Sequence, residues 1–290
     1  MAFLSYLIGG LGLGSVYAII ALGYSMVYGI AKMLNFAHGD VIMVGAFVAY
    51  FALSSFGLPT IVALILSVVA CTVLGIVVEK LAYKPLRGAS SLSVLITAIG
   101  VSYFLQNAAM LMWGTDTKIF PTILEGSLTI GKLSIPYLTL LTILSCIVIM
   151  VVLTLFINKT KTGRAMRACS EDKGAASLMG INVNQIISIT FAIGSGLAAI
   201  AAVLLCATYP SVYPTLGSMP GIKAFTAAVL GGIGSIPGAF LGGLLLGVIE
   251  NLARAYISTQ LSDAIVFMVL IVILLIKPTG LLGKKVNVKV

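Results

Sequence analysis

Apolar residues along this chain fall into eight long blocks, separated by short stretches of charged and turn-forming residues. The blocks cover residues of about 3–30, 41–56, 60–79, 92–113, 137–157, 186–208, 222–250 and 262–276. A helix needs about 20 apolar residues to cross a bilayer, so the blocks suit membrane-spanning helices. The pattern predicts an all-α fold: a polytopic transmembrane helix bundle of about eight spans.

The seventh block contains a run rich in glycine and proline, residues 231–238, where a continuous helix is not expected. Three basic segments, near 80–87, 159–173 and 277–289, are expected on the cytoplasmic side. An even number of crossings must then separate them, which requires the seventh block to be broken. We predict a short half-helix from about 222, a reversal, and a full span from about 238. Irregular backbone at membrane depth is buried or lines a wet cavity, which makes pathway candidates of Gly231, Gly232 and Gly234.

The glycines of the seventh block have two interpretations, a pathway lining and a tight packing seam between helices. The packing seam explains the pattern equally well, because the run continues in Gly242, Gly243 and Gly247. The first block has its own group of glycines that could break it, so the side of the amino terminus is left unassigned: Gly9, Gly10, Gly12 and Gly14.

Composition agrees with a membrane protein: 60% of the residues are hydrophobic, 9% are charged, and the mean hydropathy is +1.17. These values exceed those of soluble domains. The 290 residues leave no room for a sizeable soluble domain, so residues 1–290 are expected to form a single transmembrane domain. The three basic segments hold twelve of the 17 lysines and arginines. We interpret the net charge of +9 as membrane topology and not as a nucleic-acid surface.

The main polar interruption is the loop of residues 158–185, which reads NKTKTGRAMRACSEDKGAASLMGINVNQ. Basic and then mixed charges lead into a run of small residues of helical character. A basic loop is expected in the cytoplasm. A bundle that presents such a patch there, without an enzyme of its own, is expected to bind a soluble partner. The alternative is a charged turn that only sets orientation or touches anionic lipid.

Four polar residues inside or beside the blocks are candidates for the pathway or its gate: Asn35, His38, Gln106 and Asn107. For the segment LNFAHGD the alternative is a helix cap formed by Asn35 or Asp40. For Gln106 and Asn107 the alternative is a hydrogen bond between helices. A metal or catalytic site would need more His, Cys or carboxylate partners. The four cysteines are interpreted as packing residues.

Several functional classes lack their sequence signatures. There is no GxxxxGK[ST] phosphate loop, so this chain is not expected to hydrolyse ATP by that route. No row of arginines marks a voltage sensor, and no acid-rich chain resembles a proton or sodium relay. We therefore expect a permease that is driven by another subunit, and not an enzyme.

Three segments together resemble one family: LNFAHGD following ALGYSMVYG, TGRAMRACSEDKGAASLMGINVNQ and AFTAAVLGGIGSIPGAFLGGLLLG. They look like the permease subunits of high-affinity branched-chain amino acid ABC importers, of the LivH type in the LivH/LivM pair. The resemblance implies the ABC importer permease fold in the bacterial cytoplasmic membrane. It implies as partners a second, LivM-type permease, two cytoplasmic ATPases that use ATP and Mg²⁺, an extracytoplasmic substrate-binding protein and membrane lipid. It implies no cofactor and no nucleic acid for this chain.

On the loop, the resemblance implies an EAA-type coupling loop whose short helix docks in a groove of the ATPase. Gly174 stands where the name of that loop would put Glu. The implied polar contacts to the ATPase come from Arg164, Arg167, Glu171 and Asp172. The implied close-packing face comes from Ala175, Ala176 and Gly180.

Other functions remain as alternatives. Related permeases carry urea or short-chain amides, which would keep the architecture. An ATP-independent channel or facilitator, and a membrane scaffold without transport, belong to different classes. A branched-chain amino acid is a neutral zwitterion with an apolar side chain, so its path needs an apolar lining with a few dipoles and helix ends. A urea path would meet the same description.

Overall fold

The structure, a computed structural model, describes residues 2–131 and 133–283. Within these ranges the chain is mostly helical, with α1 (Ala2–Ala31), α2 (His38–Ser54), α3 (Thr60–Val78), α4 (Ser91–Trp113), α5 (Tyr137–Lys159), α6 (Lys161–Glu171), α7 (Lys173–Leu178), α8 (Val183–Thr208), α9 (Ser218–Gly231), α10 (Ile236–Tyr256) and α11 (Ser262–Ile276). A π-helical turn, η1 (Glu79–Tyr83), and a 3-10 turn, η2 (Lys84–Leu86), extend α3. The strands are β1 (Lys118–Ile119), β2 (Ser127–Ile130), β3 (Leu133–Pro136) and β4 (Ser211–Val212).

Six of the described helices are long and apolar enough to cross a membrane: α1, α3 with its extension, α4, α5, α8 and α10. The blocks at 41–56 and 262–276 form α2 and α11, which have 17 and 15 residues. These two fall below the usual length of a spanning helix. By length alone, the described residues therefore contain six candidate spans, not the predicted eight.

Short strands correct the prediction of an all-α fold. β2 and β3 form an antiparallel hairpin between α4 and α5, where polar and apolar residues alternate as a strand requires. Gly131, with φ of +64°, lies in its turn. β1 pairs with β4, so this connection also meets the segment that follows α8. The strands satisfy backbone groups that a non-helical connection would leave without partners.

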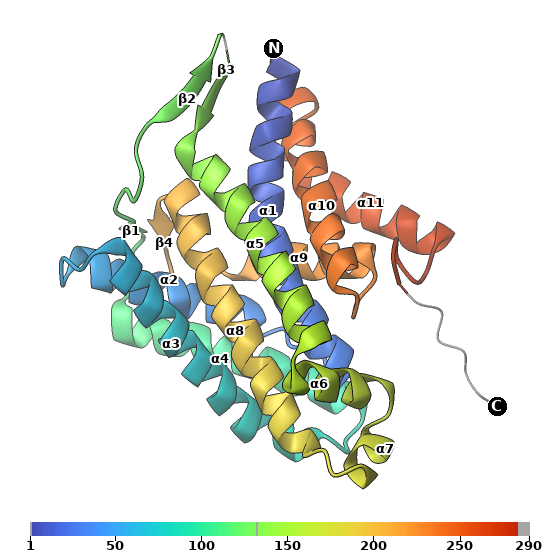
Figure 1. The fold of residues 1–290 in the computed structure, drawn as a ribbon. Coiled ribbons are helices and arrows are strands. Elements are labelled where there is room, and N and C mark those ends of the chain that lie inside the picture. The colour runs from blue at the N-terminus through green and yellow to red at the C-terminus, as the bar shows by residue number, and fades with distance from the viewer. Residues whose placement is uncertain (1, 132, 284–290) are drawn as a thin grey trace.

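A seam of small residues joins α1 to α10, and Figure 1 shows the two helices side by side. A Cβ on Gly247 would lie 2.2 Å from the Cα of Gly14, and a Cβ on Gly243 would lie 2.4 Å from the Cα of Ala18. The packing-seam interpretation is thus confirmed for Gly243 and Gly247. Because α1 is continuous over 30 residues, its glycines permit this contact and do not break the helix.

The seventh block is broken as predicted. α9 ends at Gly231 and α10 begins at Ile236. The turn between them uses Gly232 and Gly234, with φ of +106° and +92°, in a region that side chains disfavour. The two helices pack against each other, so the chain reverses direction. The half-helix begins at Ser218, earlier than the predicted position near 222.

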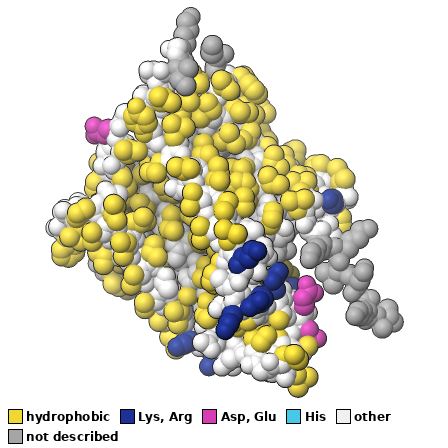
Figure 2. Space-filling model, in the orientation of Figure 1, with side chains coloured by type: hydrophobic (Ala, Val, Ile, Leu, Met, Phe, Trp, Pro, Cys, Tyr) yellow, Lys and Arg dark blue, Asp and Glu magenta, His cyan; other side chains and the backbone are white. Residues whose placement is uncertain are grey.

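The two ends of the bundle differ in character. In Figure 1 the amino terminus and the β2–β3 hairpin lie at one end, and α6 and α7 lie at the other. Figure 2 shows lysines and arginines gathered near the α6–α7 end, while hydrophobic side chains cover the flank above it. From the third predicted basic segment, Lys284, Lys285 and Lys289 lie outside the described residues.

Candidate functional site

A cavity of about 250 Å³ lies where α1, α2, α4 and α9 approach one another. We call it the polar cavity, because six of its lining residues carry polar side chains: Tyr24, Asp40, Ser102, Tyr103, Gln106 and Ser218. They come from four different helices. The fold therefore brings together groups that lie far apart in the sequence.

Gln106 connects the polar residues of this cavity. Its side-chain amide donates to Asp40 Oδ1 at 2.8 Å and lies 3.3 Å from the hydroxyl oxygens of Ser102 and Ser218. These contacts join α4 to α2 and α9, so the hydrogen bond between helices is confirmed for Gln106. Asp40 is only 2% exposed. Within the described part of the chain, no lysine or arginine pairs with its carboxylate.

Asn35 and His38 are not among the residues that line the cavity. α2 begins at His38 without a side-chain cap, which contradicts the capping alternative. Instead, Asn35 Oδ1 accepts a hydrogen bond from the Tyr83 hydroxyl at 2.8 Å. The buried His38 ring packs edge-on against Tyr24, with 4.6 Å between ring centroids, and its Nε2 faces the space left by the missing side chain of Gly23. His38 therefore supports the cavity wall through Tyr24, whereas Asn35 joins the segment before α2 to the η1 turn.

The other pathway candidates lie apart from this cavity. Asn107 is exposed on α4 and donates to the Tyr103 carbonyl of its own helix at 2.8 Å, so the bond between helices is contradicted there. Gly231, Gly232 and Gly234 lie in the α9–α10 turn. A Cβ on Gly231 or Gly232 would lie 1.9 Å or 2.4 Å from backbone atoms. Close packing therefore accounts for Gly231 and Gly232, and the positive φ of +92° accounts for Gly234.

A second polar group joins α9, α10 and α11, and the sequence analysis missed it. Lys223 Nζ lies 2.8 Å from Glu250 Oε1 and 2.6 Å from Asp263 Oδ1, while Arg254 pairs with the same oxygen of Glu250. We call these four residues the charge cluster. Lys223 is 4% exposed and Glu250 is 0% exposed. The sequence signal for the charge cluster was the presence of Lys223 and Glu250 within one apolar block.

In the loop of residues 158–185, α6 has two distinct sides. Its buried side consists of Gly163, Met166 and Cys169. Its exposed side presents Arg164, Arg167 and Glu171. A Cβ on Gly163 would lie 2.4 Å from the Ile157 Cα, so glycine allows α6 to pack tightly against the end of α5. The charged side remains accessible at this end of the bundle (Figure 2).

At the tip of the loop, Asp172 caps α7. Its carboxylate accepts hydrogen bonds from the N–H groups of Gly174 and Ala175 at 2.7 and 3.0 Å. Ala175 is exposed. Ala176, which was expected to pack against the ATPase, is 3% exposed and is buried within this chain.

The large apolar side chains of the loop tip are Leu178 and Met179, which are 91% and 82% exposed. Gly180 follows them with φ of +81° and open space around its Cβ position, so it ends α7 as glycine commonly does. From the sequence, packing was predicted for the small residues of the loop and not for Leu178 and Met179. The sequence signal for this exposed pair was the position of two large apolar residues just before a glycine that ends a helix.

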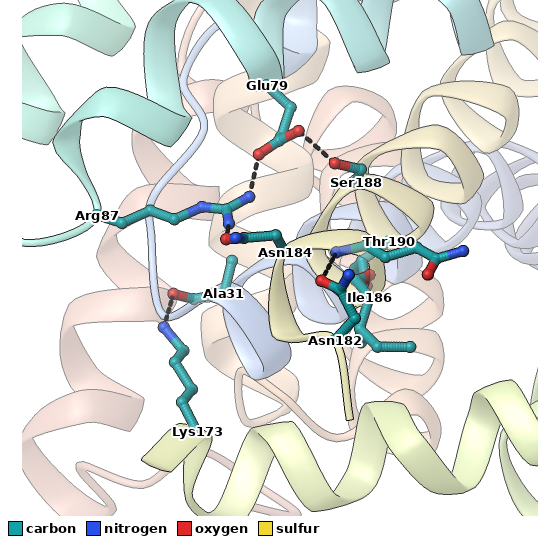
Figure 3. Close-up of polar contacts among 10 residues, drawn as sticks. Ala31, Glu79, Arg87, Lys173, Asn182, Asn184, Ile186, Ser188 and Thr190 are labelled. Carbon is teal, nitrogen blue, oxygen red and sulfur yellow. Dashed lines mark hydrogen bonds and ion pairs between the residues drawn. The ribbon is translucent and has the colours of Figure 1, made fainter. Parts of the chain in front are cut away.

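Polar contacts connect the loop to the rest of the bundle (Figure 3). Lys173 Nζ donates to the carbonyl of Ala31, the last residue of α1, at 2.6 Å. A cation is favourable at that helix end. Burial, together with the nearby charge of Arg87, lowers the pKa of Lys173. Arg87 pairs with the buried Glu79 and with Asn184 at the start of α8. The 80–87 segment and the loop thus meet at one end of the bundle.

The polar cavity and the loop of residues 158–185 are suited to binding a ligand or a partner and to movement. Among residues 2–131 and 133–283, no three His, Cys, Asp or Glu side chains are grouped to hold a metal ion. The four cysteines are free and buried, which confirms their interpretation as packing residues. The cavity offers hydrogen bonds and one carboxylate, and the loop offers an exposed apolar tip with charges beside it.

Over nearly its whole length, the chain is similar to known proteins of a single family. The family described as "Branched-chain amino acid transport system / permease component" matches residues 6–274. The chain is 48% identical to the high-affinity branched-chain amino acid transport system permease protein BraD of Pseudomonas aeruginosa, over 97% of this chain and 96% of that protein. It is 44% identical to LivH of Escherichia coli strain K12, over 97% and 96%. It is 28% identical to the probable LivH of Methanocaldococcus jannaschii, over 93% and 89%.

Proposed function

We propose how this chain works from the premise that it belongs to the family of branched-chain amino acid transport permease components. It is a multi-pass membrane protein and a permease subunit of a high-affinity branched-chain amino acid ABC transport system, not an enzyme. The proposal concerns its assembly. The chain pairs with a second, LivM-type permease, binds two cytoplasmic ATPases, and receives its amino acid from an extracytoplasmic binding protein in the bacterial cytoplasmic membrane.

The exposed apolar pair Leu178 and Met179 is the single observation that supports ATPase docking most directly. Apolar side chains exposed in a charged, water-facing loop favour a protein partner. In this proposal the pair enters the ATPase groove, and Arg164, Arg167 and Glu171 supply charged contacts around it. Ala175 lies at the edge of the contact. The roles of the other predicted coupling residues lie within the loop: Asp172 caps α7, Ala176 anchors it, and Gly180 turns the chain.

The proposed topology combines the six long helices with the shorter α2 and α11, and the half-helix α9 makes one further, partial pass. The α9–α10 turn contacts Ser25 near the carboxyl end of α1, and the end of α10 contacts Tyr6 near its amino end. The loop of residues 158–185 is then separated from Lys277 by the four passes of α8, α9, α10 and α11, so both lie on the cytoplasmic side. The loop of residues 158–185 lies in the cytoplasm because of its basic charge. The amino terminus, at the opposite end of α1, lies outside.

Coupling in this proposal depends on the Lys173 contact. Closure of the ATPase dimer moves α7, and Lys173 is bonded to the carboxyl end of α1. The chain then runs from α1 into α2, and both helices line the polar cavity. A displacement at the loop thereby reaches Gln106 and its partners, while His38 keeps the wall in shape, Asn35 joins the segment before α2 to the η1 turn, and the glycine turn holds α9 in place.

The test of this function is uptake of labelled leucine, isoleucine, valine and urea into proteoliposomes that contain the chain with its co-purifying subunits and binding protein. Leucine-type uptake that requires ATP is expected. Uptake of urea alone would move the chain to the amide branch, and flux without ATP would contradict coupling to an ATPase.

The same assay tests the docking pair. The double variant Leu178→Ala/Met179→Ala is expected to lose uptake by at least about tenfold, because anchors in a well-packed interface typically contribute 2 kcal/mol or more, and to retain less ATPase on purification. The matched control is Leu111→Ala/Met112→Ala, a Leu-Met pair on α4 that is 88% and 70% exposed. It should retain the ATPase. Normal ATPase retention in the loop variant would remove the docking claim.

A further inference from the structure

We propose that the polar cavity between α1, α2, α4 and α9 holds the amino acid during transport, with its ammonium group on Asp40 and its carboxylate near the start of α9. This inference rests on the proposed import of an amino acid. It adds the residues that contact the substrate and the orientation in which it lies.

The carboxylate of Asp40 differs from the other buried carboxylates in its charge pairing. Three acidic side chains in the described ranges are buried: Asp40, Glu79 and Glu250. Glu79 pairs with an arginine, and Glu250 pairs with a lysine and an arginine. Asp40 has the Gln106 amide but no cation. Since a buried charge is costly unless it is paired, an incoming ammonium group would supply the partner that the fold supplies to the other two.

The opposite side of the cavity suits a carboxylate. Ser218 is the first residue of α9, where the helix dipole favours negative charge. Its oxygen accepts from Gln106, which leaves its own hydrogen available to donate. The Tyr24 hydroxyl is a second donor in the lining. Gln106, bonded to both Asp40 and Ser218, sets the distance between the two polar ends.

The rest of the lining suits an aliphatic side chain. Phe36, Ile99 and Ile222 contribute apolar surface. The volume of about 250 Å³ lies below the ~300–1,000 Å³ of pockets that hold drug-sized ligands, which fits a single amino acid. Ile99 and Ile222 are 42% and 41% exposed, so the cavity opens between α4 and α9 and a ligand can enter.

A neutral amide such as urea needs no carboxylate, so the charge of Asp40 separates the two substrate classes. In the intact complex, Asp40→Asn is expected to lower leucine uptake by at least about tenfold, the scale of one charge-assisted hydrogen bond. The amount of ATPase that co-purifies should match the wild type, because the docking surfaces are unchanged. Asn107→Ala, next to Gln106 but facing outward, is the control and should transport normally.

Occupancy is measured directly with Ile222→Cys, since the four native cysteines are buried and should label slowly. Free leucine should slow thiol labelling at this position in the purified complex. 4-Methylpentanoate, which lacks the ammonium group, should not. Leucine should also fail to protect when Asp40→Asn is added.

Labelling that is indifferent to leucine, equal protection by 4-methylpentanoate, or wild-type uptake by Asp40→Asn would each overturn the site. A wild-type complex that imports leucine in the same preparation shows that the import function stands, so these outcomes concern the site alone.

Discussion

Two polar groups lie inside this apolar bundle, and they differ in how their charges are balanced. The charge cluster holds two cations and two anions in direct contact across α9, α10 and α11. The polar cavity holds one carboxylate with neutral partners, beside an open volume. The first group completes its own charge pairing. The second has room for a ligand that would complete it.

The contrast suggests different roles for similar residues. Polar groups at membrane depth are often functional, but the two cations and two anions of the charge cluster balance one another without a ligand, although Glu250 Oε2 and Arg254 Nε have no hydrogen-bond partner. We interpret the charge cluster as the element that fixes α9 against α10 and α11. Ser218, Gly221 and Ile222 line the polar cavity from the same half of α9 as Lys223, so the charge cluster holds in place the helix that forms one wall of the cavity.

The largest expected effect comes from opening the charge cluster. Glu250→Leu removes the anion that lies between Lys223 and Arg254, and breaking a buried pair costs about 3–5 kcal/mol. We expect a marked loss of folded protein and a lower Tm in detergent, measured by thermal unfolding of the purified complex.

The double variant Lys223→Met/Glu250→Leu provides the control. It removes the buried partners together and should recover much of the lost stability, since an apolar pair of similar volume often replaces a buried ion pair without loss. The remaining Arg254 and Asp263 are 31% and 40% exposed at their side chains and can reach water. A double variant as unstable as Glu250→Leu would show that the cluster does more than balance charge.

In the polar cavity, removal of the charge of Asp40 should have little effect on stability. Asp40→Asn keeps an oxygen that can accept from Gln106 and removes an unpaired buried charge, so its stability should change by no more than about 1 kcal/mol. Thermal unfolding of the same complex measures this change. A loss of stability as large as that of Glu250→Leu would contradict the proposed difference between the polar cavity and the charge cluster.

The sequence predicted features that depend on local signals. The break after Gly231 was readable because glycine and proline disfavour a continuous helix at that point, and the small-residue run of the loop, predicted to be helical, forms α7. The membrane class followed from composition. The short strands of the 114–136 connection were also visible as alternation, but the long apolar blocks dominated the interpretation.

Features that depend on the three-dimensional arrangement were less accessible. Lys223 and Glu250 are 27 positions apart, and Gln106 is 66 positions from Asp40; no periodic pattern links such pairs. Leu178 and Met179 resemble ordinary core residues in sequence, and only the fold shows that they are exposed. Helices that are apolar nearly all round also give no indication of which face lines a cavity.

The smallest effect should come from Ser218→Ala, which tests one neutral hydrogen bond of the cavity. Its oxygen accepts from Gln106 at 3.3 Å, so stability should fall by about 0.5 kcal/mol or less. If the hydroxyl also donates to the substrate carboxylate, leucine uptake should fall by about threefold to tenfold, the range of one neutral hydrogen bond. Ser15→Ala removes a buried hydroxyl that donates to the Leu11 carbonyl of its own helix and does not line the cavity, so it should leave uptake unchanged. Equal uptake by both variants would limit Ser218 to holding Gln106, and would leave Tyr24 as the donor at that end of the cavity.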